Sequence, residues 1–99
     1  MTSIDLKIMQ IFQQNMSLFP NAVHLKVADM FCRNLDENTK RRIANATIYY
    51  DIVVEILMDS AAECDDISDE VAYRKELSDR VNERLDDINY ISALIAKKR

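Results

Sequence analysis

The chain of 99 residues contains no glycine and a single proline, Pro20. Tight turns between β-strands usually require glycine, often as Asn-Gly or Asp-Gly, so the sequence offers none of these turns. Residues that favour helices predominate instead. We therefore expect an all-α protein with few, short connections, of a length suited to one domain.

Residues that carry catalytic or metal chemistry are scarce as well. The single histidine, His24, has no second histidine, cysteine or acid at ligand spacing on its own helix face, so we expect no metal site. Without glycine there is no phosphate-cradling loop. Cys32 and Cys64 form no CxxC motif and follow no recognisable secretory signal, which favours reduced thiols in a cytoplasmic protein. We expect no enzymatic activity and no cofactor.

Charge is absent from one stretch of an otherwise charged chain. The 18 residues from Ile8 to Leu25, IMQIFQQNMSLFPNAVHL, contain no Lys, Arg, Asp or Glu. Three Gln, two Asn, a Ser, a Pro and a His make this stretch too polar for a membrane span, which needs ~20 mostly apolar residues. We therefore expect no membrane contact, and a stretch that packs inside the fold or against a partner.

Apolar residues at helical spacing predict four helices. Their expected ranges are about 3–16, 21–35, 39–64 and 68–97. Pro20 lies in the first connection, because proline interrupts a helix. Ser68 is the expected N-cap of the last helix.

The last two predicted helices have matching apolar seams. A chain reversal near residues 65–68 brings these positions together: Ile43 with Ile91, Ala46 with Ile88, Tyr50 with Arg84, Val53 with Val81, and Leu57 with Leu77. All but one of these pairs are apolar on both sides, as expected for packed antiparallel helices. The sequence therefore predicts a long antiparallel helical hairpin over residues 39–97, with arms of about 40 Å at ~1.5 Å per residue.

A second apolar stripe on the third predicted helix needs cover, and it consists of Ile48, Ile52 and Ile56. We expect residues 1–35 to supply this cover as a short helical arm of two helices packed on the hairpin. Residues 1–99 then form a single small four-helix domain.

Charges are predicted to divide between the two ends of the hairpin. Six acids and no base lie from Asp59 to Glu70, around the turn. Two basic clusters meet at the other end, where they are candidate contacts for an anion or a nucleic acid: Lys40, Arg41, Arg42, Lys97, Lys98 and Arg99. The alternative is that both clusters are solvated helix ends. A carboxylate stripe along the third helix is also expected to be solvated, and it consists of Asp51, Glu55, Asp59 and Glu63.

The favoured function is a small acidic helical module that binds another protein or a second copy of itself, as an adaptor, inhibitor, immunity protein or chaperone-like regulator. Its candidate partner-binding residues lie in the uncharged stretch, beside several Gln and Asn residues that are expected to face outward. They are Met9, Met16, Leu18 and Phe19. Interface cores are depleted in charge and enriched in Met and aromatic residues. We therefore expect a symmetric dimer through this stretch.

The alternative function is a DNA-binding transcriptional regulator. The segment VADMFCRNLDENTKRRIANA is similar to a helix-turn-helix, with residues 27–34 as the first helix and Lys40–Arg42 entering the groove. The usual turn glycine is absent, and Lys40 occupies a position that is normally apolar. The net charge of −4 and the pI of about 4.9 also disfavour general affinity for phosphates. Nucleic acid is therefore the less favoured partner.

Overall fold

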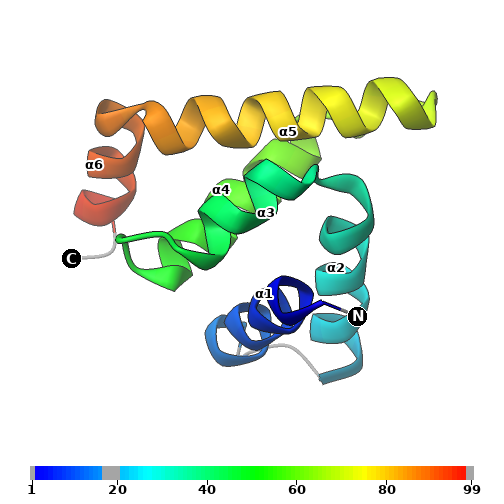
Figure 1. The fold of residues 1–99 in the computed structure, drawn as a ribbon. Coiled ribbons are helices and arrows are strands. Elements are labelled where there is room, and N and C mark those ends of the chain that lie inside the picture. Colours follow the sequence, from blue (N-terminus) through cyan, green and yellow to red (C-terminus); the bar gives the residue numbers. More distant parts are fainter. Residues whose placement is uncertain (1, 17–20, 98–99) are drawn as a thin grey trace.

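The computed structural model describes residues 2–16 and 21–97, and these residues form helices without strands (Figure 1). The expectation of an all-α fold is confirmed. Six helices are described in place of four: α1 (Ser3–Asn15), α2 (Asn21–Asn34), α3 (Glu37–Ala44), α4 (Tyr50–Glu63), α5 (Glu70–Asp86) and α6 (Ile88–Lys97). No helix within these ranges is both long enough and apolar enough to cross a membrane.

The expected helix over residues 39–64 is interrupted at residues 45–49, so this prediction is wrong. Asn45 ends α3, and its N–H contacts the carbonyl groups of Arg41 and Ile43. α4 begins after Tyr49, whose backbone is extended. The connection consists mainly of Asn, Thr, Ile and Tyr, which favour helices less than Ala or Leu. The apolar spacing continues through the segment, but its weak helix propensity allows the break.

A second break, at Asp87, divides the last predicted helix into α5 and α6. The Asp87 carboxylate accepts a hydrogen bond from the Tyr90 N–H at 3.1 Å and caps α6. α5 is capped by Asp69, which accepts from the Ala72 N–H at 3.0 Å, so the prediction of Ser68 as the cap is wrong by one position. The expected arms of about 40 Å are also too long, because the whole molecule extends only 37 Å along its longest axis.

α3 and α4 form the middle of the molecule, with α5 crossing them on one side and α1 and α2 on the other (Figure 1). The rings of Phe12 and Phe31 stack with their centres 5.4 Å apart and join α1 to α2. The main core continues from these rings through fully buried aliphatic residues of α1, α3, α4 and α5: Ile8, Ile11, Ile43, Val53, Leu57, Leu77 and Val81. Burying each large apolar side chain contributes about 1.5–3 kcal/mol, so this core is the main source of stability.

α4 and α5 run antiparallel, but in a register different from the predicted one. The Arg84 guanidinium donates to Ser60 Oγ at 3.0 Å, whereas the predicted register would place Arg74 opposite Ser60. The predicted pairing of Tyr50 with Arg84 is wrong, because the ammonium of Lys7 lies 5.1 Å from the centre of the Tyr50 ring. Ile43, Val53, Leu57, Leu77 and Val81 of the predicted seam are nevertheless buried, whereas Ala46 and Ile91 are partly buried and Ile88 is 77% exposed. A seam that repeats every three or four residues matches in several registers, so its periodicity identifies the core without identifying the pairs.

The second apolar stripe of α4 is covered by α6. Ile52 and Ile56 form a small second core with Leu94. The prediction that residues 1–35 cover this stripe is wrong, because the break at Asp87 lets the last helix fold back along α4. α1 instead contributes to the main core.

Candidate interaction surface

α6 carries no charged residue before its last residue, Lys97, and one side of it packs on the body of the protein. From Ile88 to Ala96 it contains no Lys, Arg, Asp or Glu. Leu94 is buried against α4, and the residues packed around this small core are only partly buried: Ile48, Leu85, Tyr90, Ile91 and Ile95. Some apolar surface around this small core therefore stays accessible to solvent.

The opposite side of α6 faces solvent. Ile88 is 77% exposed. Ser92 and Ala96 follow it at intervals of four residues and are also exposed, as are the neighbouring Asn89 and Ala93. A surface helix normally places charged residues on its solvent side. α6 places an isoleucine and small uncharged residues there, which is typical of a contact surface.

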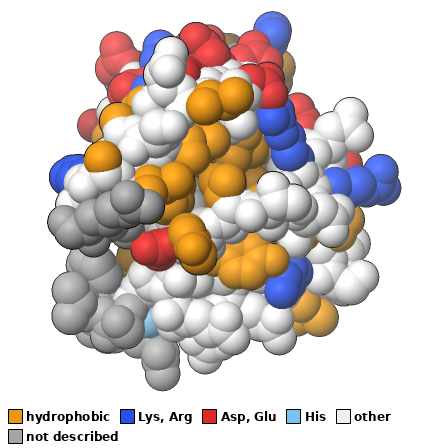
Figure 2. Space-filling view, turned by 90° about the vertical axis from the view of Figure 1, so that its left-hand side faces the viewer, with side chains coloured by type: hydrophobic (Ala, Val, Ile, Leu, Met, Phe, Trp, Pro, Cys, Tyr) orange, Lys and Arg blue, Asp and Glu red, His pale blue; other side chains and the backbone are white. Residues whose placement is uncertain are grey.

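A small groove with both polar and apolar lining residues adjoins α6. It has a volume of about 210 Å³ and is lined by Arg42, Asn45, Ala46, Thr47, Ile48, Leu85 and Ile91. Tyr49, which follows the groove residues in the sequence, is 73% exposed. Figure 2 shows this side of the molecule, where hydrophobic side chains gather in a hollow in the middle of the face. We define the α6 surface as this groove together with Ile88, Ile91, Ser92, Ile95 and Ala96.

Charged residues stand at the two ends of α6. Glu83, Asp86 and Asp87 precede the helix, and Lys97 closes it. The Lys97 side chain is 74% exposed, and its ammonium lies 3.9 Å from the Glu55 carboxylate. Arg42 pairs with Asp86, and Arg80 and Arg84 lie beside Glu83 and Asp87, so the start of the helix carries charges of both signs.

A polar network fixes α6 to α4 and α5. The Tyr90 hydroxyl donates to the Asp59 carboxylate, and the Arg84 guanidinium lies 5.2 Å from the centre of the Tyr90 ring. Arg84 also pairs with Glu63, and its hydrogen bond holds the pKa of that carboxyl below the ordinary value. Asp59 and Glu63 are exposed, in keeping with the expected solvated stripe, and both also contact neighbouring helices.

The predicted partner-binding residues lie apart from the α6 surface or outside the described residues. Met16 is buried in the main core, and Met9 packs against that core with partial burial. Leu18 and Phe19 lie outside the described residues. Part of the uncharged N-terminal stretch is thus explained by the core. The sequence reasoning missed α6, although its uncharged run over residues 88–96 was a signal of the same kind.

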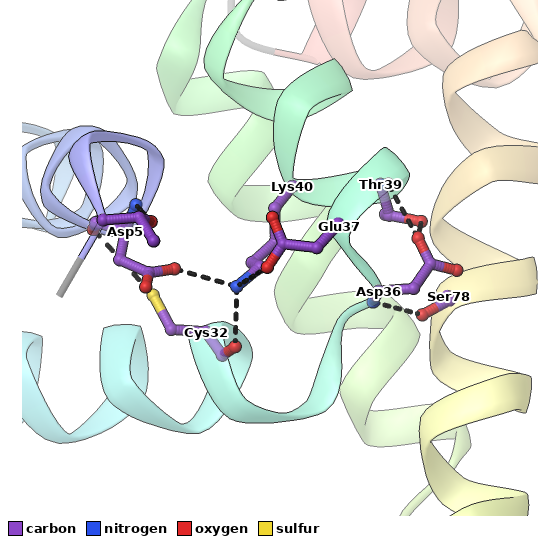
Figure 3. A network of polar contacts seen from close by, with 8 residues as sticks. Asp5, Cys32, Asp36, Glu37, Thr39, Lys40 and Ser78 are labelled. Atoms are coloured by element: carbon purple, nitrogen blue, oxygen red, sulfur yellow. Dashed lines mark hydrogen bonds and ion pairs between the residues drawn. The ribbon is translucent and has the colours of Figure 1, made fainter.

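Lys40, a predicted contact for an anionic partner, lies inside the protein (Figure 3). Its side chain is 7% exposed. The ammonium contacts Asp5 Oδ1 at 2.9 Å, Glu37 Oε1 at 3.1 Å and the Cys32 carbonyl at 3.2 Å. Burial by itself would lower the pKa of Lys40, but the hydrogen bonds to the two acids outweigh burial and raise it. An ammonium has three donors, and these three acceptors occupy them.

The remaining basic residues do not form one exposed cluster with Lys40. Arg42 donates to the Asn82 side chain at 3.3 Å and pairs with Asp86, so it joins α3 to α5. Arg41 is exposed. Lys97 lies at the far end of α6, and the last two predicted contacts, Lys98 and Arg99, lie outside the described residues.

A polar cleft of about 560 Å³ lies between the α2–α3 connection and α5. Its charged lining residues have both signs: Arg33, Asp36, Glu37, Lys40, Arg74, Lys75 and Asp79. Several of them pair with one another, as Lys75 does with Asp79 at 2.8 Å. The cleft therefore presents no strong excess of one charge to a ligand.

His24, Cys32 and Cys64 are the side chains best suited to metal or redox chemistry. His24 is buried, and neither of its ring nitrogens has a hydrogen-bond partner within residues 2–16 and 21–97. Burial raises the pKa of Cys32 to about 11, so its thiol is protonated at neutral pH. Burial also raises the pKa of Cys64. In the part of the chain that the structure describes, no group of three His, Cys, Asp or Glu side chains is placed to hold a metal ion.

Comparison with known proteins adds no family to this description. No family model matches the chain, no curated protein matches it, and no solved structure matches it. The interpretation of function therefore depends on the residues and contacts of the molecule itself.

Proposed function

We propose that this protein acts by binding another protein through the α6 surface. The observation that carries the proposal is an exposed helix side without charge in a chain of which 30% of the residues are charged. Interface cores are depleted in charged residues, and contiguous exposed apolar surface on a small protein marks interaction sites. Ile88 supplies the exposed apolar side chain, and the adjoining groove offers a recess for a side chain of the partner.

Capture of binding partners by the purified protein tests this proposal, with Ile88→Glu and Val71→Glu as a matched pair. Ile88 is 77% exposed and Val71 is 76% exposed, and both lie in the first turn of a helix, where an acid favours the helix dipole. Both variants should therefore fold. We expect a specific protein to be retained by the wild type and by Val71→Glu but lost with Ile88→Glu. Equal retention by both variants would contradict the proposal.

The proposal includes a cytoplasmic location and a binding role without catalysis. Cys32 and Cys64 are free thiols, which suits a reducing compartment. The described contacts of Asp59, Glu63 and Lys40 attach helices to one another, so these titratable groups are accounted for by the fold.

DNA binding through a helix-turn-helix has less support. α2 and α3 are joined by two residues, fewer than the three or four of such a motif. The side chain of Lys40 is buried, and Arg42 is held by α5. Arg41 alone of that trio offers an exposed guanidinium without an ion pair among the described contacts. A mobility shift with duplex DNA at low salt, abolished by Arg41→Gln, would favour this alternative.

A further inference from the structure

A single residue separates α5 from α6. α5 ends at Asp86 and α6 begins at Ile88, and Asp87 between them has an extended backbone with φ of −88° and ψ of 96°. Figure 1 shows α6 folding back from the end of α5 at this point. Residues 84–91 contain neither glycine nor proline, so no residue there prevents a helix from continuing. A change of backbone conformation centred on Asp87 would therefore join α5 and α6 into one helix.

The apolar spacing continues across Asp87. Leu77 and Val81 are fully buried on the side of α5 that faces the main core. Ile88 lies seven positions after Val81, and positions seven apart share one side of a helix. The turn at Asp87 removes Ile88 from that side and leaves it 77% exposed. A continuous helix over residues 70–97 would thus place Ile88 on the same stripe as the buried residues of α5.

Joining the two helices also provides partners for backbone groups. The first N–H groups of a helix have no carbonyl partner within that helix. At the start of α6, the Asp87 carboxylate accepts a hydrogen bond from the Tyr90 N–H at 3.1 Å. In a continuous helix the N–H groups of Ile88, Asn89 and Tyr90 would instead donate to the carbonyl groups four residues earlier. These backbone bonds offset the loss of the capping bond.

A small set of contacts holds α6 on its own chain. Leu94 is buried and forms a small core with Ile52 and Ile56 of α4. The Tyr90 hydroxyl donates to the Asp59 carboxylate. Straightening the helix would break these contacts and expose Ile52 and Ile56, which are at most 2% exposed in the structure. Exposing such apolar side chains to water is unfavourable, so an opened chain needs a replacement for α6.

We infer that α6 is an exchangeable helix, which packs either on α4 of its own chain or on α4 of a second copy. In the second case α5 and α6 form one continuous helix, and Leu94 of each chain packs on Ile52 and Ile56 of the other. A second copy is the partner because its α6 carries the same residues that fill this core in the closed chain. Exchange of an identical element restores the contacts of the monomer, so it is a low-cost route to a dimer. The inference does not depend on the proposed function, because it involves the packed side of α6.

Asp87→Ala and Asp87→Gly are a matched pair that tests the exchange. Both substitutions remove the carboxylate that caps α6. Glycine is tolerated at a cap but disfavours the interior of a helix, whereas alanine is unfavourable at a cap and favours the interior. Each dimer contains two such positions, so the preference acts twice.

Sedimentation equilibrium at tens to hundreds of micromolar measures the difference, after incubation until the ratio of monomer to dimer is constant. Asp87→Ala should have a dimer association constant at least about tenfold greater than that of Asp87→Gly. Circular dichroism should show that both variants remain folded helical proteins.

A crosslink between two copies tests the arrangement itself. In the closed chain the Lys97 ammonium lies 3.9 Å from the Glu55 carboxylate, and in the exchanged dimer these two positions belong to different copies. Glu55→Cys and Lys97→Cys, each combined with Asp87→Ala, should therefore be joined by a short bifunctional maleimide when they are mixed before the incubation. Each of these variants by itself should give no such product. Asp87→Ala with only the native Cys32 and Cys64 should give none either.

Two results would overturn the inference. The first is a dimer association constant of Asp87→Ala that is no greater than that of Asp87→Gly. The second is a dimer of Asp87→Ala in which positions 55 and 97 of different copies are not joined, since such a dimer would form without exchange of α6. Capture of a protein through Ile88 tests the proposed function separately, because it reports on the exposed side of α6.

Discussion

The ammonium of Lys40 donates a hydrogen bond to the carboxylate of Asp5 at 2.9 Å, between residues 35 positions apart in the chain. Both side chains are largely removed from solvent. α3 is only eight residues long, and so short a helix is not stable by itself in water. The ion pair therefore holds α3 against α1, and the position of α3 depends on contacts of this kind.

Replacing Lys40 by Met should destabilise the protein by about 2–3 kcal/mol. The side-chain volume is nearly kept, but the largely buried Asp5 carboxylate loses its charged partner and the Cys32 carbonyl loses a donor. Urea denaturation followed by circular dichroism measures the change. Lys75→Met is the control, because the ion pair of Lys75 with Asp79 lies on the surface and its loss should leave stability nearly unchanged. Equal effects of the two substitutions would show that Lys40 is not held as described.

A double-mutant cycle checks that the effect belongs to the pair. Asp5→Asn combined with Lys40→Met should cost less than the sum of the two single changes, because the second substitution removes a group that the first has already left without its partner. Additive losses in urea denaturation would mean that the two side chains do not interact.

Stability should decrease as the pH falls below about 4.5. In the folded protein the hydrogen bond from Lys40 lowers the pKa of Asp5 from 3.8, and the hydrogen bond from Arg84 lowers the pKa of Glu63 from 4.5. The unfolded chain therefore takes up protons at a higher pH than the folded protein does. The stabilising contribution is complete above the unfolded-state values and is lost as the pH falls through the lower folded-state values.

Urea denaturation midpoints between about pH 7 and pH 3 measure this dependence. Asp5→Asn should be less stable than the wild type at neutral pH and should approach it at low pH, since the substituted residue no longer titrates. A pH dependence as steep as that of the wild type would exclude Asp5 as one of the responsible groups.

Asp69→Ala should destabilise the protein by about 1 kcal/mol, whereas Ser68→Ala should have little effect. Asp69 accepts the Ala72 N–H at 3.0 Å and so satisfies a free donor of the first turn of α5. Ser68 precedes the cap and is exposed. Thermal denaturation of the two variants decides between the cap found in the structure and the cap expected from the sequence. A larger loss with Ser68→Ala would favour the sequence-based assignment.

Composition and apolar spacing were sufficient to predict the helical class and most of the buried residues. The absence of glycine excluded tight strand turns, and the spacing of Val53, Leu57, Leu77 and Val81 identified residues that are fully buried. Both signals depend on properties that a helix has locally. They do not depend on which helices become neighbours.

The arrangement of the helices could not be predicted in the same way. Apolar spacing continues across residues 45–49 and across Asp87, so periodicity alone did not reveal the two breaks. Asp87 caps α6 by accepting a hydrogen bond from the N–H of Tyr90, three residues later. The sequence alone does not distinguish such a capping Asp from an exposed Asp inside a continuous helix. Because the chain turns at Asp87, α6 covers Ile52 and Ile56. The N-terminal helices therefore do not cover these two residues, although the sequence had led us to expect that they would.

The candidate site was misplaced for a related reason. Uncharged sequence marks both core and interface, and only the structure separates them. Met16 proved to be core, while the uncharged run over residues 88–96 has one buried side and one exposed side. Lys40 was taken for a surface charge because a lysine is seldom buried unless it is paired. Its partner Asp5 is too distant in the sequence to be recognised from spacing.

Val53→Asp and Val81→Asp should each unfold the protein or destabilise it by more than about 4 kcal/mol. Both side chains are fully buried in the main core, where a carboxylate would lose its hydration without gaining a partner. Val71→Asp is the control, because Val71 is 76% exposed in the first turn of α5 and an acid there suits the helix dipole. Thermal denaturation should show Val71→Asp close to the wild type, with the other two far below it. If Val53→Asp melted near the wild type while Val81→Asp did not, the α4 face that carries Val53 would have to be turned away from the core. α6 would then lose its place against Ile52 and Ile56, since these residues lie on the adjoining face of the same helix.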